Sequence, residues 1–160
     1  MKILIVSDTH RRDGNLTGVL EIEGKVDRLI HLGDVEGSQN FICQAAGCEV
    51  DMVAGNNDFM GYLPKEKEIM LGGKKVLLTH GHYYYVSLDT KMLKREAKAR
   101  GFDIAMYGHT HKPRIEREGD LTILNPGSLT YPRQEGRKPS YIVMEIDEQN
   151  NISYEIKYLE

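Results

Sequence analysis

The sequence has only two cysteines, Cys43 and Cys48, among its 160 residues. They do not form a paired metal-ligand spacing such as C-x-x-C, which argues against a zinc site built from thiolates. We therefore interpret both side chains as reduced, buried thiols of a cytosolic protein.

Long hydrophobic runs are also missing. No segment approaches the roughly 20 apolar residues that a membrane-spanning helix requires. The apolar run at residues 3–6 is far too short for a secretion signal. We therefore expect a cytoplasmic protein with no membrane association.

A large excess of charge of either sign is absent as well. The formal net charge is −3 and the isoelectric point is near 6.1, so a dedicated nucleic-acid binder is not expected. Arg11 and Arg12 beside His10 form the one basic cluster of interest. With 40% hydrophobic and 28% charged residues, the composition is that of an ordinary globular protein. At this length we expect a single domain, residues 1–160.

The first third of the chain predicts a β-α-β-α-β order. Three nearly all-apolar runs, at 2–7, 27–32 and 49–54, are typical of strands that are covered on both faces. Helices are expected between them at 16–22 and 38–46. Nearby glycines weaken the first helix, whereas Ser38 can cap the second.

The middle of the chain contains a hairpin and the clearest helix. Two glycines at 72–73 separate strand-like runs and predict a tight turn. A helix is expected from Asp89 to Gly101, with Asp89 as its cap and Leu88 and Leu93 as a hydrophobic staple. The predicted strands of this half are 66–71, 74–79, 103–107, 114–117, 121–124, 141–146 and 152–158. This order favours two stacked mixed sheets with helices on their outer faces, an α/β fold.

Five of the predicted strands end in a loop with metal-binding side chains. Each loop carries a carboxylate, an amide or an imidazole, and most also contain a glycine. The loops are Asp8-Thr9-His10, Gly33-Asp34, Gly55-Asn56-Asn57-Asp58, His80-Gly81-His82 and Gly108-His109-Thr110-His111.

Each of these loops has a simpler interpretation when it is taken alone. Asp34 could cap the following helix, Asn56 could be a turn residue, and His109 with His111 could be a hydrogen-bonded pair. A common metal site explains all five loops at once. Nitrogen and oxygen donors suit a pair of borderline-hard ions, and two ions roughly 3.5–4 Å apart can hold a phosphate. The sequence therefore predicts a metal-dependent phosphoesterase.

Several neighbouring residues receive supporting interpretations. In an extended chain Asp8 and His10 would share a face and reach the same ion. Asp58 is expected to orient a ligand rather than to bind metal. His31 lies within a strand, where a hydrogen-bonded core or surface histidine is the simplest reading. The tyrosines at 83–85 could line a substrate pocket, form a subunit contact or simply pack.

The ordered set of loops resembles the signature of calcineurin-like metallophosphoesterases. The short chain and the segment Asn125-Pro126-Gly127-Ser128 are similar to the small YfcE-like phosphodiesterase branch of bacteria and archaea. The resemblance covers residues 8–128. It implies a four-layer α-β-β-α sandwich of two mixed β-sheets flanked by helices.

The resemblance also implies a dinuclear centre of two divalent ions. Manganese is the expected metal, with nickel, iron or zinc as alternatives. In such a centre a metal-bridging hydroxide attacks phosphorus in line, and Asp34, His10 and Asn56 are expected to contribute most directly to catalysis. The implied ligands are Asp8, His10 and His111 for one ion, Asn56, His80 and His109 for the other, and Asp34 as the bridge between them.

One position departs from the family pattern. Many relatives have a histidine after the ligand asparagine, where it is thought to protonate the leaving group, but this chain has Asn57. A missing general acid costs roughly 10²–10⁴-fold in rate. His82 or His10 could substitute for it. Arg11, Asn57 and His82 are the residues that we expect to contact substrate.

The resemblance favours hydrolysis of a small phosphodiester over two alternatives. A phosphomonoesterase would be expected to surround the phosphate with more positive charge than this sequence offers. The other alternative is a non-catalytic scaffold like the retromer subunit of this fold, which departs from histidine at the position of His10. The exposed terminal hairpin and the tyrosine cluster leave room for a homodimer.

Overall fold

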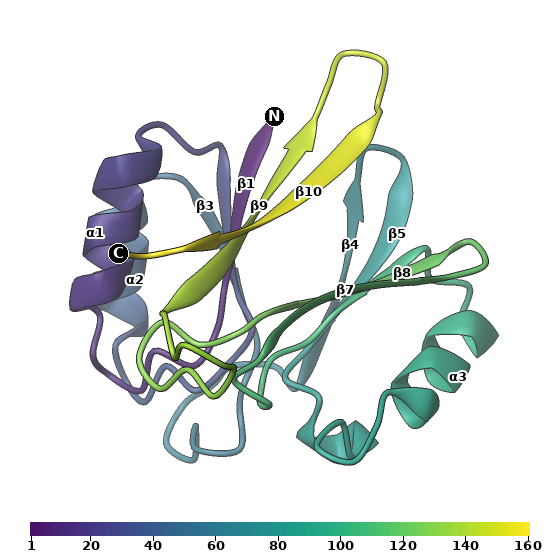
Figure 1. Cartoon of the computed structure of the whole chain (residues 1–160), viewed down its shortest axis with the longest axis horizontal. Helices are drawn as coiled ribbons and strands as arrows, with labels where there is room; N and C mark the ends of the chain where they lie inside the picture. Colours follow the sequence, from purple (N-terminus) through teal and green to yellow (C-terminus); the bar gives the residue numbers. More distant parts are fainter.

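Strands with apolar side chains on both faces form the centre of the fold. In the computed structural model, which describes residues 1–160, they make two five-stranded sheets packed face to face (Figure 1). The first sheet has the order β10-β9-β1-β2-β3 and the second β4-β5-β6-β8-β7. The strands of the first sheet are Lys2–Val6 (β1), Arg28–His31 (β2), Glu49–Met52 (β3), Ser140–Ile146 (β9) and Ile152–Tyr158 (β10). Those of the second are Glu66–Leu71 (β4), Lys74–Thr79 (β5), Ile104–Met106 (β6), Pro113–Glu118 (β7) and Leu121–Pro126 (β8).

Both sheets are mixed, with a parallel block at the centre of each. β1, β2 and β3 are parallel, and β9 and β10 continue that sheet in antiparallel pairing. In the second sheet β5, β6 and β8 are parallel, and β4 and β7 are antiparallel edge strands. The parallel blocks matter for function because the carboxyl ends of parallel strands meet at one edge of a sheet.

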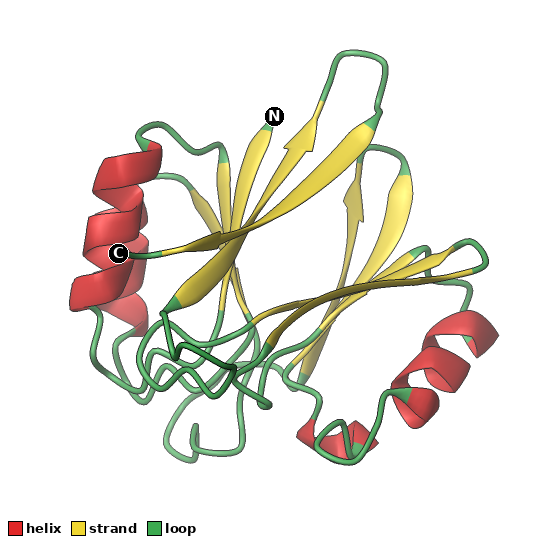
Figure 2. Ribbon diagram, in the orientation of Figure 1, coloured by secondary structure: helices red, strands yellow, loops and turns green.

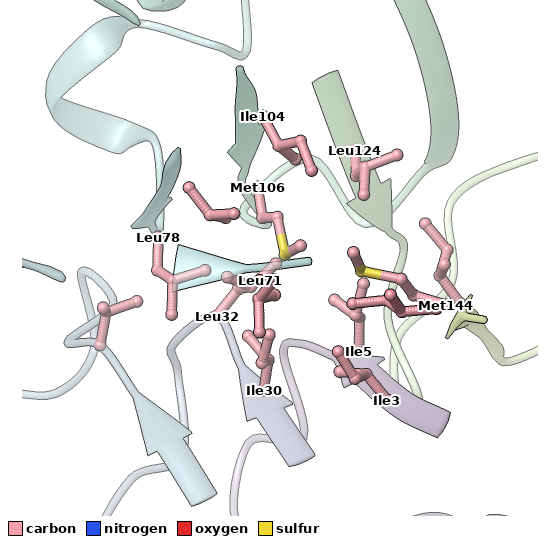
Figure 3. Close-up of a cluster of buried hydrophobic side chains, with 14 residues drawn as sticks. Ile3, Ile5, Ile30, Leu32, Leu71, Leu78, Ile104, Met106, Leu124 and Met144 are labelled. Atoms are coloured by element: carbon pink, nitrogen blue, oxygen red, sulfur yellow. The ribbon is translucent and has the colours of Figure 1, made fainter. Parts of the chain in front are cut away.

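Successive residues of the buried strands pack into different layers. Ile3 and Ile5 of β1 enter the core between the two sheets, together with Leu78 of β5 and Met106 of β6 (Figure 3). Leu4, on the opposite face of β1, belongs to a second apolar cluster. Each fully buried side chain of this kind contributes about 1.5–3 kcal/mol relative to its exposure to water. Because both faces of these strands are buried, their sequences are continuous apolar runs.

Three α-helices cover the outer faces of the sheets. They are Gly14–Glu23 (α1), Gln39–Ala46 (α2) and Lys91–Ala99 (α3). Leu16 of α1 and Ile42 of α2 pack against the outer face of the first sheet, whereas Leu93 of α3 packs against the second. Figure 2 shows these helices on opposite sides of the two sheets. The predicted four-layer α-β-β-α sandwich is therefore confirmed.

Two predicted helix caps are wrong. Ser38 precedes α2, but its hydroxyl donates to the carbonyl of Val35 at 2.8 Å instead of capping the helix. The cap position of α3 is Thr90, one residue later than predicted, and the Asp89 carboxylate accepts a hydrogen bond from the Lys91 amide. The predicted staple is absent because Leu88 is 85% exposed. Leu93 is buried and packs against the second sheet.

Other local predictions have mixed outcomes. The hairpin at 72–73 is confirmed, since both glycines have positive φ angles, 54° and 75°, as a tight turn requires. Cys43 and Cys48 are free, as expected, but Cys43 is exposed and Cys48 only half-buried, so the prediction of buried thiols is wrong. A short 3-10 helix, His82–Tyr84 (η1), was not predicted. No helix has the length and apolar character needed to cross a membrane.

Glu23 at the end of α1 joins three strands. Its side chain is 3% exposed and lies 2.7 Å from the Lys2 ammonium and 3.0 Å from the Lys157 ammonium. It also accepts a hydrogen bond of 2.9 Å from the hydroxyl of Tyr141. Burial raises the pKa of Glu23, but these three partners outweigh burial and lower the pKa to about 2.

We predict that Glu23→Gln destabilises the protein by about 2–3 kcal/mol at pH 7. Because the folded-state pKa lies below the ordinary value near 4.5, the contribution is complete above pH 4.5 and disappears as the pH falls toward 2. Urea unfolding at pH 7 and at successively lower pH measures this difference. Glu21→Gln, an exposed neighbour on α1, is the control. Equal free energies of unfolding for Glu23→Gln and wild type at pH 7 would contradict the prediction.

Candidate metal centre

The loops that follow the parallel strands converge at one end of the sandwich, at the bottom of Figure 2. β1 leads into Asp8, β2 into Asp34 and β5 into His80, and β6 is followed by His109. Because the two sheets face each other, the strand ends of both contribute side chains to the same place. The structure thus brings together all the ligand positions predicted from separate parts of the sequence.

One group of donors is centred on Asp8. Its Oδ1 lies 3.0 Å from Nε2 of His111 and 3.8 Å from Nε2 of His10, and the two imidazole nitrogens are 3.4 Å apart. Donors bound to one ion about 2.1 Å away lie roughly 3.0–3.5 Å from each other. Asp8, His10 and His111 therefore have the mutual spacing of a coordination sphere.

A second group is centred on His80. Its Nε2 lies 3.0 Å from Oδ1 of Asn56 and 3.5 Å from Oδ2 of Asp34. The Asn56 oxygen is also 2.9 Å from Nδ1 of His109. Asp34 reaches toward the first group too, because its Oδ2 is 3.8 Å from Nε2 of His10. The two groups thus meet at the Asp34 carboxylate.

Hydrogen bonds aim the lone pairs of two imidazoles at this centre. The Nδ1–H of His80 donates to the carbonyl of Leu32 at 2.6 Å, and the Nδ1–H of His111 donates to the carbonyl of Tyr131 at 2.8 Å. Such bonds fix the tautomer of a ligand and leave Nε2 free to bind a metal. They turn the Nε2 atoms of these two buried histidines toward the carboxylates of Asp34 and Asp8.

Asp8 provides the strongest sign that a cation belongs here. Its Oδ1 is buried and accepts no hydrogen bond, yet it lies 3.0 Å from the nitrogen of His111. Two acceptors at this distance repel each other unless a proton or a cation lies between them. Burial raises the pKa of Asp8, but the partners His111, His80 and Ser7 outweigh it and lower the pKa. The donor set therefore fits a divalent metal.

In the second group, too, charged and hydrogen-bonding partners outweigh burial in setting the pKa values. Burial lowers the pKa of His80, but the carboxylates of Asp34 and Asp8 outweigh burial and raise it. Burial raises the pKa of Asp34, but His80 and Asn57 outweigh it and lower the pKa.

The backbone is strained where the predicted ligands lie. Ten residues other than glycine have positive φ angles, and they include five predicted ligands: Asp8, His10, Asp34, His109 and His111. A left-handed conformation of this kind costs about 1 kcal/mol or more for each residue and persists only where other interactions enforce it. The expectation that Asp8 and His10 share a face of an extended chain is wrong, since their φ angles are 56° and 47°. Sharp turns bring them together instead.

Two glycines are required by the close approach of the ligand loops. A Cβ atom at Gly55 would lie 2.1 Å from Oδ1 of Asp34, and a Cβ atom at Gly108 would lie 2.1 Å from Oγ of Ser7 and 2.8 Å from Oδ2 of Asp8. No real side chain tolerates such distances. The glycines beside the predicted ligands thus let the backbone pass directly behind the carboxylates.

Asp58 supports the centre in a different way from that predicted. Its carboxylate accepts hydrogen bonds from the backbone amides of Asp34 at 2.7 Å, Glu36 at 2.7 Å and Gly55 at 2.8 Å. It contacts no imidazole in these bonds. Asp58 therefore holds the strained backbone of the Asp34 loop against the Gly55 loop.

The segment after β8 ties two other loops together. The Asn125 amide donates to the carbonyl of Gly108 at 3.0 Å and to the Thr110 hydroxyl at 2.9 Å. The Ser128 hydroxyl donates to the carbonyl of Asp8 at 2.9 Å. These contacts explain why the Asn-Pro-Gly-Ser segment accompanies the histidine motifs.

The residues predicted to contact substrate have different positions. Arg11 is exposed and lines a cavity that Asn57 also lines. The side chain of Asn57 donates to Oδ2 of Asp34 at 2.9 Å, so it holds the carboxylate rather than facing outward. His82 packs beside His80, with 5.4 Å between the ring centres, and burial lowers its pKa to about 4. His82 is thus neutral at neutral pH.

His31 is a core residue. It is fully buried, lies 3.1 Å from the Thr9 hydroxyl, and accepts a hydrogen bond from the Gly33 amide at 3.2 Å. Burial lowers its pKa to about 4. The sequence interpretation of a hydrogen-bonded core histidine is confirmed.

Some residues at the centre were not singled out from the sequence. Glu36 lies 3.6 Å from Nδ1 of His10, and the Tyr131 ring lies edge-on to the His10 ring with centres 5.3 Å apart. Arg133 and Arg137 line a cavity beside His10 and His111. The only available signal for Tyr131, Arg133 and Arg137 was their position a few residues after the Asn-Pro-Gly-Ser segment, whereas Glu36 stands two residues after Asp34.

The four-layer sandwich and its cluster of nitrogen and oxygen donors define the class of metal-binding phosphoesterases. The model of the calcineurin-like phosphoesterase superfamily domain matches residues 1–149. The chain belongs to this superfamily. Membership implies that divalent metal ions bind at such a site.

Individual relatives agree with this assignment. A probable metallophosphoesterase of Methanocaldococcus jannaschii is 34% identical, over 83% of this chain and 70% of the relative. A phosphodiesterase of the same organism is 31% identical, over 79% of this chain and 83% of its own length. The crystal structure of a predicted phosphoesterase from Streptococcus pneumoniae has a TM-score of 0.83 and 30% sequence identity. The match covers 98% of this chain and 88% of that one.

Zinc-bound Vps29 from Entamoeba histolytica has a TM-score of 0.78 at 24% identity and covers 99% of each chain. This likeness concerns the fold alone. The shared architecture therefore carries no conclusion about activity.

We predict that Asp58→Ala weakens Mn²⁺ binding by about 10–100-fold, because the loops that carry Asp34 and Asn56 lose their common acceptor. Isothermal titration with Mn²⁺ measures the affinity, after circular dichroism has shown an intact fold. Asp120→Ala, in an exposed turn, is the matched control. An unchanged affinity in a folded Asp58→Ala protein would show that this carboxylate does not position the metal site.

Proposed function

We propose that the protein is a dinuclear metal-dependent phosphodiesterase that acts on a small phosphate ester. The observation that carries this proposal is the set of buried and half-buried nitrogen and oxygen donors that face one another, and above all the Oδ1 atom of Asp8, which accepts no hydrogen bond. We assign Asp8, His10 and His111 to one ion and Asn56, His80 and His109 to the other, with Asp34 between them. Manganese is the metal that we would test first, and we infer a cytoplasmic location.

The chain's own residues would arrange the reaction around this centre. Two divalent ions, when bound, supply Lewis acidity that lowers the pKa of water and neutralises charge on the phosphoryl oxygens. Asn57 and Asp58 would hold Asp34 in place, through its carboxylate and through its backbone amide respectively. His10 is 13% exposed, so it lies at the open side of the centre where an ester would enter.

One argument supports a preference for phosphodiesters, and one argument made from the sequence fails. A relative with 31% identity is named a phosphodiesterase. The sequence-based argument that cationic groups are scarce near the phosphate no longer holds, because Arg133 and Arg137 line a cavity beside the centre. The assay must therefore compare diester and monoester directly.

We predict Mn²⁺-dependent hydrolysis of bis-p-nitrophenyl phosphate that is faster than hydrolysis of p-nitrophenyl phosphate. Asp34→Ala should reduce diester turnover at least about 100-fold, since it removes the carboxylate shared by the two donor groups. Release of nitrophenolate measures the rate, and Asp120→Ala is the control. A faster monoester reaction would favour a phosphomonoesterase.

A second candidate function is a non-catalytic protein-binding scaffold. The observation that favours it is the loop beside the centre, where Phe59 and Met60 are 83% and 98% exposed and Tyr62 is fully exposed. Exposed apolar loops of this kind are found at protein interfaces. A protein that binds two Mn²⁺ ions but hydrolyses neither ester would favour the scaffold.

We predict that Asn57→His accelerates hydrolysis of a diester with a poor leaving group, such as diphenyl phosphate, by about tenfold or more. An imidazole can protonate a departing phenolate, whereas an amide cannot. The nitrophenyl ester, whose leaving group needs little protonation, should gain much less. Asn57→Ala separates the new acid from the lost bond to Asp34. Equal rates for Asn57→His and Asn57→Ala on both esters would contradict the idea that a missing acid limits the rate.

A further inference from the structure

A cavity of about 450 Å³ opens directly from the metal centre. This volume is in the range of small-molecule sites. Its lining combines two predicted ligands with an aromatic ring and two guanidinium groups. The lining residues are His10, His111, Tyr131, Pro132, Arg133 and Arg137.

The cationic groups of this cavity have no acidic partner within ion-pair distance. Arg133 and Arg137 are exposed, and neither takes part in an ion pair, unlike Arg28, Arg100 and Arg114 elsewhere in the chain. Arginine binds phosphate and carboxylate groups through paired, charge-assisted hydrogen bonds. The cavity thus presents two guanidinium groups that have no acidic partner, next to the predicted metal ligands His10 and His111.

The loop that bears these arginines is attached to a predicted metal ligand. The Arg133 amide donates to the carbonyl of His111 at 3.0 Å, and Nδ1 of His111 donates to the carbonyl of Tyr131 at 2.8 Å. Arg137 has a φ angle of 45°, a strained conformation held by a hydrogen bond from its amide to the carbonyl of Gln134 at 3.0 Å. The backbone at Arg133 is therefore tied directly to a predicted metal ligand, and Arg137 follows in the same loop.

We propose that Arg133 and Arg137 form a subsite for a second anionic group of the substrate. This inference rests on the proposed function, because it names the class of ester: a phosphodiester that carries a further phosphate or carboxylate on the part entering this cavity. Tyr131 lines the same cavity as His10, and its ring lies edge-on to the His10 ring. The guanidinium carbon of Arg12 lies 5.3 Å from the centre of the Tyr131 ring.

The first test measures anion binding without metal. Inorganic pyrophosphate is titrated into EDTA-treated protein at low ionic strength, where screening of exposed charges is weak. We expect wild type to bind it and the double variant Arg133→Gln/Arg137→Gln to bind at least about tenfold more weakly. Arg95→Gln, an exposed arginine on α3 without an acidic partner, is the control. Absence of binding to wild type, or equal binding to the double variant, would overturn the subsite.

The second test uses two esters that differ by one phosphate. Thymidine 5′-(p-nitrophenyl phosphate) and its 3′-phosphorylated form release the same nitrophenolate. With Mn²⁺ we expect wild type to have a KM about tenfold lower for the 3′-phosphorylated ester. The double variant should lose that difference. An equal KM for the two esters in wild type, or a difference that survives in the double variant, would overturn the proposal.

Failure of the subsite and failure of the proposed function give different results. If wild type hydrolyses bis-p-nitrophenyl phosphate but the arginine variants behave like the Arg95 control, only the subsite is wrong. If pyrophosphate binding depends on the two arginines but no ester is hydrolysed with Mn²⁺, the subsite stands and the proposed enzyme activity fails.

Discussion

Repulsion between buried acceptor atoms is the constraint on which the rest of the structure depends. The carboxylate of Asp8 and the imidazole of His111 face each other at 3.0 Å with no hydrogen bond on the carboxylate oxygen. Burying polar atoms without partners is unfavourable by several kcal/mol, so the chain must hold them together by other means. The carbonyls behind His80 and His111, the carboxylate of Asp58 and the hydroxyl of Ser128 all serve this purpose.

The layered fold tolerates that repulsion because burial of apolar side chains in other parts of the molecule stabilises it. The core between the sheets and the two clusters beneath the helices bury apolar side chains along the whole length of the strands. The strained residues Asp8, Asp34 and His109 lie in loops that follow strands and not within the strands. A sandwich with two parallel blocks thus supplies rigid strand ends on both sides of one cleft, and left-handed turns direct the side chains inward.

Much of the architecture could be predicted from the sequence because its signals are local. Apolar runs mark strands, and a polar donor after each run marks a strand end, so the gathering of Asp8, Asp34 and His80 follows from parallel topology. The conformation of those ends could not be predicted. Asp and His rarely adopt positive φ, and only contacts between distant segments enforce it.

Contacts between residues far apart in the sequence could not be predicted either. Asp58 was expected to support a ligand, but its actual partners are backbone amides, which no residue pattern reveals. The staple at Leu88 fits the local pattern, yet the chain there turns the side chain into solvent. Arg133 and Arg137 adjoin the centre only because the segment after β8 folds back onto His111.

The segment that folds back after β8 links the lining of the cavity to the support of His111. The segment that carries Tyr131, Arg133 and Arg137 exchanges two hydrogen bonds with His111. Both bonds use backbone atoms of the loop, so a change in its backbone path would alter the cavity and the support of a predicted ligand at once, and the effects of such changes in the two places would not add. A different backbone path for this loop would therefore require compensating changes around His111.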